Sequence, residues 1–311
     1  MKEKGGRKIV VITGCWITNM GSAFIDFGSI ESIKQACPEA EIFTASSFPV
    51  WLFHSQSKNN VLLRGCFSNY FSLISQLDSE IAIFSGMVLS EGFIERYGTE
   101  ILNLSRRGVK IIINGGGAGT YSEEEVKKYR EFLKEIKPHC FISRDEESFN
   151  YYKDLAKHSL NGIDCGFFVS DFFKPTPLLL GRFEVHTFDK IPDPVKSGKD
   201  NSVIRTHHSL WKLNRKFFKE ANTMMSDRPE DYLNLYANAE VTHSDRVHAC
   251  VAALAFGRKC RLYLDTPRAQ LFEKAGISVK EIGDNIVSLD QNKLTAAKKT
   301  QINFLIPVLN E

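Results

Sequence analysis

Short apolar runs without polar alternation recur along this chain, and a helical pattern follows nearly every one. The clearest runs are residues 8–13 (KIVVIT), 80–85 (EIAIFS) and 109–113 (VKIII). Strands with apolar side chains on both sides must be covered on both faces. Because helical segments alternate with these strands, the sequence predicts parallel sheets with helices on each face. The predicted fold class is therefore α/β, with Rossmann-like, doubly wound sheets.

The same patterns place each expected element along the chain. We expect strands at residues 8–13, 41–44, 80–85, 109–113, 139–143, 202–205, 222–225, 240–242 and 261–264. We expect helices at residues 22–36, 92–106, 122–136, 146–155, 211–220, 228–239, 245–256, 268–274 and 294–309. The glycine-rich stretch at residues 114–119 (NGGGAG) is expected to form a turn.

The alternation of strands and helices breaks between residues 164 and 200, a proline-rich stretch with the polar runs DKIPDP and KSGKDN. A chain of 311 residues also exceeds what one hydrophobic core usually organises. We therefore expect an N-terminal Rossmann-like domain at residues 1–180 and a second one at 181–311, facing each other across a cleft. The helix at 294–309 should pack against these domains, and packing against the N-terminal domain is one possibility that the sequence leaves open.

Composition excludes several classes of function. The net charge of +3 is nearly balanced and no long block of Lys and Arg is present, so we expect no nucleic-acid partner. No stretch approaches the roughly 18 to 20 apolar residues of a spanning helix, and the start, MKEKGG, does not resemble a secretory signal. Seven cysteines without a C-x-x-C pair favour a reduced cytoplasmic location and argue against a zinc site.

A charged pair follows one predicted strand at its carboxyl end, where open α/β sheets bind their ligands. Arg144 and Asp145 come directly after the strand at 139–143 and before a helix. An arginine there can bind a carboxylate or a phosphate bidentately, assisted by the helix N-terminus. A surface arginine beside an Asp N-cap explains the same pattern equally well, so both interpretations stay open.

The segment 240–256 predicts an anion site. A short strand is followed by a helix of small apolar residues, with Ser244 or Asp245 as its cap and Arg246 and His248 in its first turn. Positive charge at a helix N-terminus is unfavourable by a few tenths to about 1 kcal/mol, so the two cationic residues indicate a bound anion. The same dipole would lower the pKa of His248, which suits a group that transfers protons near neutral pH.

Two further histidines, His207 and His208, follow the strand at 202–205. They could contact a phosphate, and a partly exposed pair of loop histidines explains them about as well. The NGGGAG stretch does not match G-x-G-x-x-G, so a dinucleotide site is not expected.

Taken together, these segments resemble the polysaccharide pyruvyl transferases. The C-terminal signature of that family is a strand, a turn and a helix with S-x-R-L-H followed by A-x-x-x-G. This chain has residues 244–248 (SDRVH) followed by 253–257 (ALAFG). Further matches follow in the family's order: Asn19, Gly21 and Ala23; Arg144, Asp145 and Ser148; and residues 162–164 (GID).

The resemblance implies a GT-B-like fold and transfer of the enolpyruvyl group of phosphoenolpyruvate to a sugar of a polysaccharide or its precursor. The product would be a pyruvate ketal, with phosphate released. The implied catalytic residues are Arg246, which with Arg144 would hold the carboxylate and the phosphate, and His248, a general acid or a phosphate anchor. The implied substrate-binding residues are Arg144, Asp145, Ser244, Val247, Asn19, Gly21, His207 and His208.

The implied partners are phosphoenolpyruvate, as donor substrate, and a sugar acceptor. No cofactor and no metal is expected. A lipid-linked acceptor, and with it a location at the inner face of the membrane, stays open. One departure from the family bears on activity, because Ser22 stands where the family usually has Asp.

Two other functions remain as alternatives. The first is a nucleotide-sugar glycosyltransferase of the same GT-B architecture. Retaining enzymes of that class often place a glutamate in the C-terminal strand–loop–helix, and residues 244–257 contain none. The second is a degenerate, non-catalytic relative that binds glycan. Ser22 favours it, whereas the retained Arg144, Arg246 and His248 argue against it.

Overall fold

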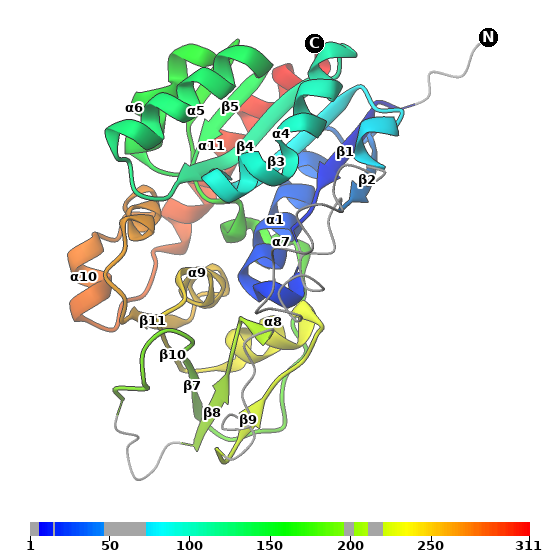
Figure 1. Cartoon of the computed structure of the whole chain (residues 1–311). Helices are drawn as coiled ribbons and strands as arrows, with labels where there is room; N and C mark the ends of the chain where they lie inside the picture. The colour runs from blue at the N-terminus through cyan, green and yellow to red at the C-terminus, as the bar shows by residue number, and fades with distance from the viewer. Residues whose placement is uncertain (1–5, 15, 47–72, 196–201, 211–219) are drawn as a thin grey trace, which may run out of the picture.

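Two parallel β-sheets organise the chain, one above the other in Figure 1, with helices around and between them. The computed structural model describes residues 6–14, 16–46, 73–195, 202–210 and 220–311. The helix expected at 211–220 lies outside the described residues except for its last position. The predicted α/β class with two Rossmann-like sheets is confirmed.

The N-terminal sheet has the strand order β2-β1-β3-β4-β5-β6, and all neighbouring strands are parallel. The strand order reverses at β1 and β3, which marks the switch point where ligands of such folds bind. Its strands are β1 (Lys8–Ile12), β2 (Glu41–Ala45), β3 (Ile81–Leu89), β4 (Lys110–Ala118), β5 (Cys140–Ser143) and β6 (His158–Asn161).

Helices cover both faces of this sheet. On one face α1 (Met20–Ala36) and α11 (Gln291–Asn310) share a buried apolar cluster with the strands. On the other face lie α4 (Glu91–Arg106), α5 (Glu123–Ile136) and α6 (Glu146–Tyr152). The last helix, red in Figure 1, therefore returns to the N-terminal sheet. None of the helices in the described part of the chain is long and apolar enough to cross a membrane.

The second sheet has the strand order β11-β10-β7-β8-β9 and is also parallel throughout. Its strands are β7 (Phe183–Thr187), β8 (Ser202–Thr206), β9 (Thr223–Met224), β10 (Val241–Ser244) and β11 (Lys259–Leu262). The helices beside it are α8 (Pro229–Asn238), α9 (Val247–Ala255) and α10 (Val279–Asp284). Shorter elements complete the described chain: η1 (Trp16–Thr18), η3 (Ile74–Gln76), η4 (Lys153–Leu155), η5 (Cys165–Phe168), α7 (Val169–Phe172) and η8 (Pro267–Ala275).

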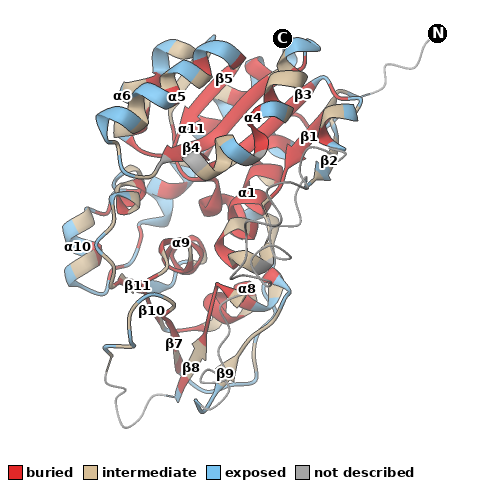
Figure 2. Cartoon of the chain, viewed as in Figure 1, coloured by how far each residue is buried: buried red, intermediate tan, exposed pale blue. Residues whose placement is uncertain are grey.

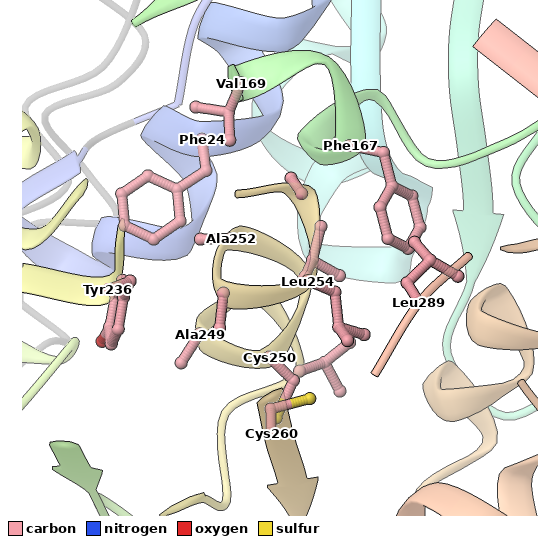
Figure 3. Packing of buried hydrophobic residues seen from close by; sticks show 14 of the residues in the cluster. Phe24, Phe167, Val169, Tyr236, Ala249, Cys250, Ala252, Leu254, Cys260 and Leu289 are labelled. Atoms are coloured by element: carbon pink, nitrogen blue, oxygen red, sulfur yellow. The ribbon is translucent and has the colours of Figure 1, made fainter. Parts of the chain in front are cut away.

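Helix α9 lies between the two sheets and is buried along nearly its whole length (Figure 2). Its residues are small, so α1, η5 and the second sheet can all approach it closely. Figure 3 shows Phe24 and Tyr236 on one side of α9 and Phe167 and Leu289 on the other. One apolar cluster therefore runs from the second sheet through α9 to α1, which holds the two halves together.

Several sequence predictions need correction. The strands β6 and β7 were not expected, because their polar residues hide the apolar pattern. The glycine-rich stretch 114–119 does not form a turn after β4: most of it continues the strand, with register shifts against both neighbours. The segment expected as a helix at 268–274 is the 3-10 helix η8. The helix α10 was not expected.

Candidate functional site

The N-termini of α1 and α9 meet between the two sheets, and a glycine makes this contact close. A Cβ atom on Gly21 would lie only 2.8 Å from the Cβ of His248. Asn19 is the N-cap of α1, and its side chain accepts a hydrogen bond from the Gly21 amide. The loop before α1 and the start of α9 therefore lie in contact. Gly21 permits this contact because it has no side chain, and Asn19 caps α1 beside it.

A polar pocket opens at this contact, at the carboxyl ends of the strands of the second sheet. Each loop that follows β7, β8, β10 and β11 contributes to it, and α1 contributes its N-cap. The residues that line the pocket are Asn19, Lys190, His208, Asp245, Arg246, Val247, His248, Leu264 and Arg268. This is the position at which α/β sheets of this type bind their ligands.

Arg246 joins the two halves of the molecule at the pocket. Its guanidinium donates a hydrogen bond of 2.8 Å to Asn19 Oδ1 on the N-terminal side. Its Nε lies 3.4 Å from Asp189 Oδ2 on the C-terminal side. The side chain is 15% exposed, so it is held in place and still reaches the pocket.

His248 faces a buried carboxylate that it shares with Arg144. Its Nε2 lies 3.3 Å from Asp164 Oδ2, and Arg144 donates to the same oxygen over 3.1 Å. Burial opposes ionisation of Asp164, but His248 and Arg144 outweigh it and lower the Asp164 pKa to about 2. Burial lowers the pKa of His248, and Arg144 and Arg268 add to that effect against the pull of Asp164.

Arg144 lies behind the pocket and not on its wall. Its side chain is only 1% exposed, and its second terminal nitrogen finds no acceptor among the described residues. The extended glycine stretch of β4 makes room for it, since a Cβ on Gly117 would lie 2.3 Å from Arg144 Nε. In this conformation Arg144 reaches the pocket only through Asp164 and His248.

Two cations that line the pocket were not identified from the sequence. Arg268 opens η8 after β11, and Lys190 follows β7. Burial lowers the pKa of Arg268 to about 10, and the nearby guanidinium groups of Arg144 and Arg246 contribute. Like charges near one another are unfavourable, and a bound anion would offset this repulsion. Arg268 could have been identified from the sequence, because it is a cation that follows the carboxyl end of the strand predicted at residues 261–264.

The cap of α9 differs from the prediction. The helix begins at Val247, so Arg246 is at the N-cap position and only His248 lies in the first turn. Asp245 does not cap α9: its carboxylate accepts hydrogen bonds from the backbone amides of residues 189–191. Ser244 accepts from the Arg246 amide and donates to a backbone carbonyl of β7. Asp245 therefore stabilises the loop after β7 beside the pocket, and Ser244 links the turn before α9 to β7.

The two histidines after β8 are buried, so the alternative of a partly exposed pair is wrong. His207 Nδ1 lies 3.2 Å from Asp189 Oδ1, on the loop that also contacts Arg246. His208 lines the pocket, and its Nε2 bonds the Tyr236 hydroxyl at 2.6 Å. Burial and the charge of Arg246 lower the His208 pKa to about 3, which keeps this ring neutral.

Asp145 is the N-cap of α6, as expected, and accepts from the Ser148 amide at 2.7 Å. It also accepts a hydrogen bond from the Tyr121 hydroxyl. It does not line the pocket, so the structure places it beside the site as support for the turn that carries Arg144. Val247, by contrast, lies on the pocket wall.

Solved structures with the same architecture support the GT-B-like description. UDP-GlcNAc 2-epimerase from Neisseria meningitidis bound to UDP-GlcNAc is similar at a TM-score of 0.56 and 10% identity, over 96% of this chain and 100% of that chain. The S. aureus MnaA–UDP co-structure gives 0.56 and 10%, over 97% and 90%. An epimerase described as putative, from Listeria monocytogenes, gives 0.56 and 10%, over 96% and 88%. At this identity the likeness concerns the fold alone.

Sequence comparison identifies the family. No curated protein matches the sequence. The family model of the polysaccharide pyruvyl transferases matches residues 19–264, a range that runs from the N-cap of α1 through the signature helix α9 to Leu264 and includes every residue of the pocket wall except Arg268. This range covers well over half of the chain, and the protein therefore belongs to the polysaccharide pyruvyl transferase family.

Proposed function

We propose that the protein transfers the enolpyruvyl group of phosphoenolpyruvate to a sugar of a polysaccharide or its precursor, forming a pyruvate ketal. The observation that carries this proposal is the pocket in which Arg246, Arg268 and Lys190 surround His248. The donor has a carboxylate and a phosphate ester on the same carbon. It therefore needs several cations close together and one group that can protonate its methylene carbon.

The proposed reaction balances its atoms and protons. The methylene carbon of phosphoenolpyruvate gains a proton and becomes a methyl group. The central carbon forms bonds to two sugar oxygens, and its bond to the phosphate oxygen breaks. The two hydroxyl groups release two protons, of which one offsets the proton added to carbon and the other leaves with the phosphate.

Within this proposal the arginines have two different roles, binding of the donor and positioning of His248. Arg246 and Arg268 bind the carboxylate and the phosphate, because both reach the pocket and one of them carries a depressed pKa that an anion would restore. Arg144 acts as a positioning residue: through Asp164 it fixes the ring of His248. This role differs from a direct clamp, and it follows from the burial of Arg144.

His248 is the proposed proton donor. In the free protein its pKa lies below the usual value of 6.5, so the ring is largely neutral near pH 7. A bound phosphate and carboxylate would place negative charge beside the ring and raise that pKa. The donor substrate would thereby create the protonated histidine that its own reaction requires.

The acceptor sugar would approach from the side of Asn19 and Gly21, where α1 begins. The cytoplasm is the proposed location, in keeping with the free, buried thiols of Cys37, Cys140, Cys165, Cys250 and Cys260. The test below has two arms, which distinguish a free acceptor sugar from a lipid-linked one.

The test measures phosphate release from phosphoenolpyruvate with a panel of acceptors, one arm with soluble oligosaccharides and one with lipid-linked sugars in detergent. We expect release that requires an acceptor, together with a ketal methyl signal in the product by NMR. The matched variants are Arg246→Gln, expected to remove turnover, and Arg228→Gln, an exposed arginine outside the pocket, expected to retain it.

Thermal shift separates the alternatives. Phosphoenolpyruvate should raise Tm in the wild type and not in Arg246→Gln. Stabilisation by UDP-GlcNAc with none by phosphoenolpyruvate would favour a protein that acts on nucleotide sugars and overturn the proposal. Stabilisation by a glycan, with no phosphate release from any acceptor, would favour a non-catalytic glycan-binding protein.

A further inference from the structure

The outer face of the second sheet, opposite α8 and α9, carries a row of histidine and carboxylate side chains. Along β7, Phe183 and Val185 point into the apolar core, so Glu184 and His186 point to the opposite face. On the neighbouring strand β10, His243 is in register with His186. Two imidazoles and a carboxylate therefore share one patch of the sheet.

The three side chains point their ligand atoms at one another. Glu184 Oε2 lies 3.8 Å from His186 Nε2 and 3.6 Å from His243 Nε2. All three atoms lie within 4.8 Å of one another. The imidazoles are almost fully buried, and the glutamate side chain is 16% exposed.

The far nitrogen of each imidazole has a partner that fixes the ring. His186 Nδ1 lies 2.6 Å from Asp193 Oδ2, and His243 Nδ1 lies 3.0 Å from the Tyr263 hydroxyl. When Nδ1 donates its proton in this way, the lone pair of Nε2 is left facing Glu184. Carboxylates that orient metal-binding histidines act in this manner.

A second observation points to a ligand at this place. The Nε2 atom of His186 is buried and has no hydrogen-bond partner among the described residues. An unsatisfied buried polar atom costs about 1 to 3 kcal/mol, so it calls for an explanation. A Lewis acid between this nitrogen, His243 and Glu184 would supply the missing interaction.

We propose that Glu184, His186 and His243 form a site for a divalent transition-metal ion of the zinc type. Two histidines and one glutamate, with a fourth position for water, are a known ligand set for that ion. Tetrahedral bonds of about 2.0 to 2.1 Å place neighbouring ligand atoms roughly 3.3 Å apart. The two distances to Glu184 need to shorten by only a few tenths of an ångström. Imidazole ligands also select against magnesium and calcium.

Two arginines flank the row, and both already have other interactions. Arg205 Nε lies 3.8 Å from Asp193 and from Glu220. Arg261 donates to a backbone carbonyl of α10 and stacks over the Tyr263 ring. Arg261 is nevertheless in register with His243, and its charge adds to the effects of burial and of His186 in lowering the pKa of that ring. A surface pocket lined by His186, Asp193 and Arg205 borders one ring of the trio.

The metal would have a structural consequence for the anion pocket. Asp193 belongs to the loop that follows β7, and the same loop carries Asp189 and Lys190. A metal on His186 strengthens its bond to Asp193 and so ties this loop to the sheet. The inference does not rest on the proposed transfer reaction, since metal binding is measured without substrate.

The test titrates cobalt(II) and zinc(II) into the full chain after removal of metals with a chelator. We expect one equivalent to bind, and the cobalt form to show the intense visible absorption of a tetrahedral site. His243→Gln and Glu184→Gln should weaken binding on the order of 100-fold or more. Asp193→Asn, which alters only the outer partner, should weaken binding about 10- to 100-fold.

The matched control is His158→Gln, in the other described trio of this kind, formed by His139, His158 and Glu311. It should leave cobalt binding unchanged. Loss of binding in this control with retention in His243→Gln, or a wild-type protein that binds no equivalent below about 100 µM, overturns the proposal. If His243→Gln fails to fold by circular dichroism, Glu184→Gln and the wild-type cobalt spectrum decide the question.

Discussion

At the scale of single residues, the chemistry of the pocket depends on the protonation of His248. Because the pKa of His248 is lowered in the free protein, kcat/KM should fall as the pH rises above that pKa, which lies below 6.5. The kcat profile should fall at a higher pH, since a bound anion raises the same pKa. Initial rates measured from pH 5 to 9 give both profiles, and the two pH values at which they decline can then be compared.

Removal of the ring tests the assignment directly. His248→Gln should lower kcat roughly 10²- to 10⁴-fold and abolish the alkaline limb of the remaining activity. His158→Gln, far from the pocket, should keep the wild-type profile. An unchanged kcat in His248→Gln would exclude the histidine as proton donor.

Arg268 offers a prediction about binding of the donor. Arg268→Gln removes the charge of a buried cation that lies near Arg144 and Arg246. The same change should raise KM for phosphoenolpyruvate about 10-fold or more, because a charged hydrogen bond to the donor is lost. A residue with a purely structural role would give a lower Tm and an unchanged KM.

At the scale of elements, the site depends on how closely α1 and α9 approach each other. Gly21→Ala would place a methyl group 2.8 Å from the Cβ of His248 and force the two helices apart. We expect a loss of 1 to 3 kcal/mol in the free energy of unfolding, about the cost of overpacking, and at least a 10-fold loss in kcat. Gly283→Ala, where nothing lies within 4 Å, is the matched control.

Helix α1 also carries a buried carboxyl group, that of Asp26, which makes the stability of the fold depend on pH. Asp26 accepts hydrogen bonds from the Gly14 amide and the Trp16 indole, yet burial raises its pKa from 3.8 to about 7. The folded protein therefore binds the proton more tightly than the unfolded chain does. The stability from this group is present below pH 4 and is lost as the pH rises through about 7.

Asp26→Asn should remove this dependence. The variant should resemble the wild type near pH 4 and be more stable at pH 8, by up to about 4 kcal/mol. Urea unfolding of both proteins at several pH values measures the difference. A variant that is less stable than the wild type at pH 8 would mean that the ionised carboxylate contributes to the native state.

At the scale of the whole molecule, α11 links the end of the chain to the N-terminal sheet. Gln301 on this helix accepts a hydrogen bond from the Ile163 amide and donates one to Asn114 Oδ1, both in buried surroundings. Gln301→Leu would leave both partners unsatisfied and should cost about 2 to 5 kcal/mol. Gln35→Leu, an exposed position on α1, should change stability by less than about 0.5 kcal/mol.

Hydrogen exchange locates the effect of Gln301→Leu. Faster exchange in both β4 and α11 would show that the helix stabilises the N-terminal sheet. Faster exchange in α11 alone would show that the two elements unfold independently.

The apolar strands of the N-terminal sheet were predictable because burial on both faces leaves a continuous apolar run. The strand β7 was not, since Glu184 and His186 interrupt its apolar pattern on one face. For this reason the trio with His243 was invisible in the sequence, which predicted no metal site.

The sequence alone determined the α/β class, the family and the signature residues on α9, because these depend on local periodicity and on fixed short spacings. Only the tertiary structure decided which charges meet. Arg144 and Asp164 come from different strand ends and pair in the interior, whereas Arg268 and Lys190 arrive at the pocket from separate loops. Coulomb interactions depend on distance in space and on burial, and neither follows from the spacing of two residues along the chain.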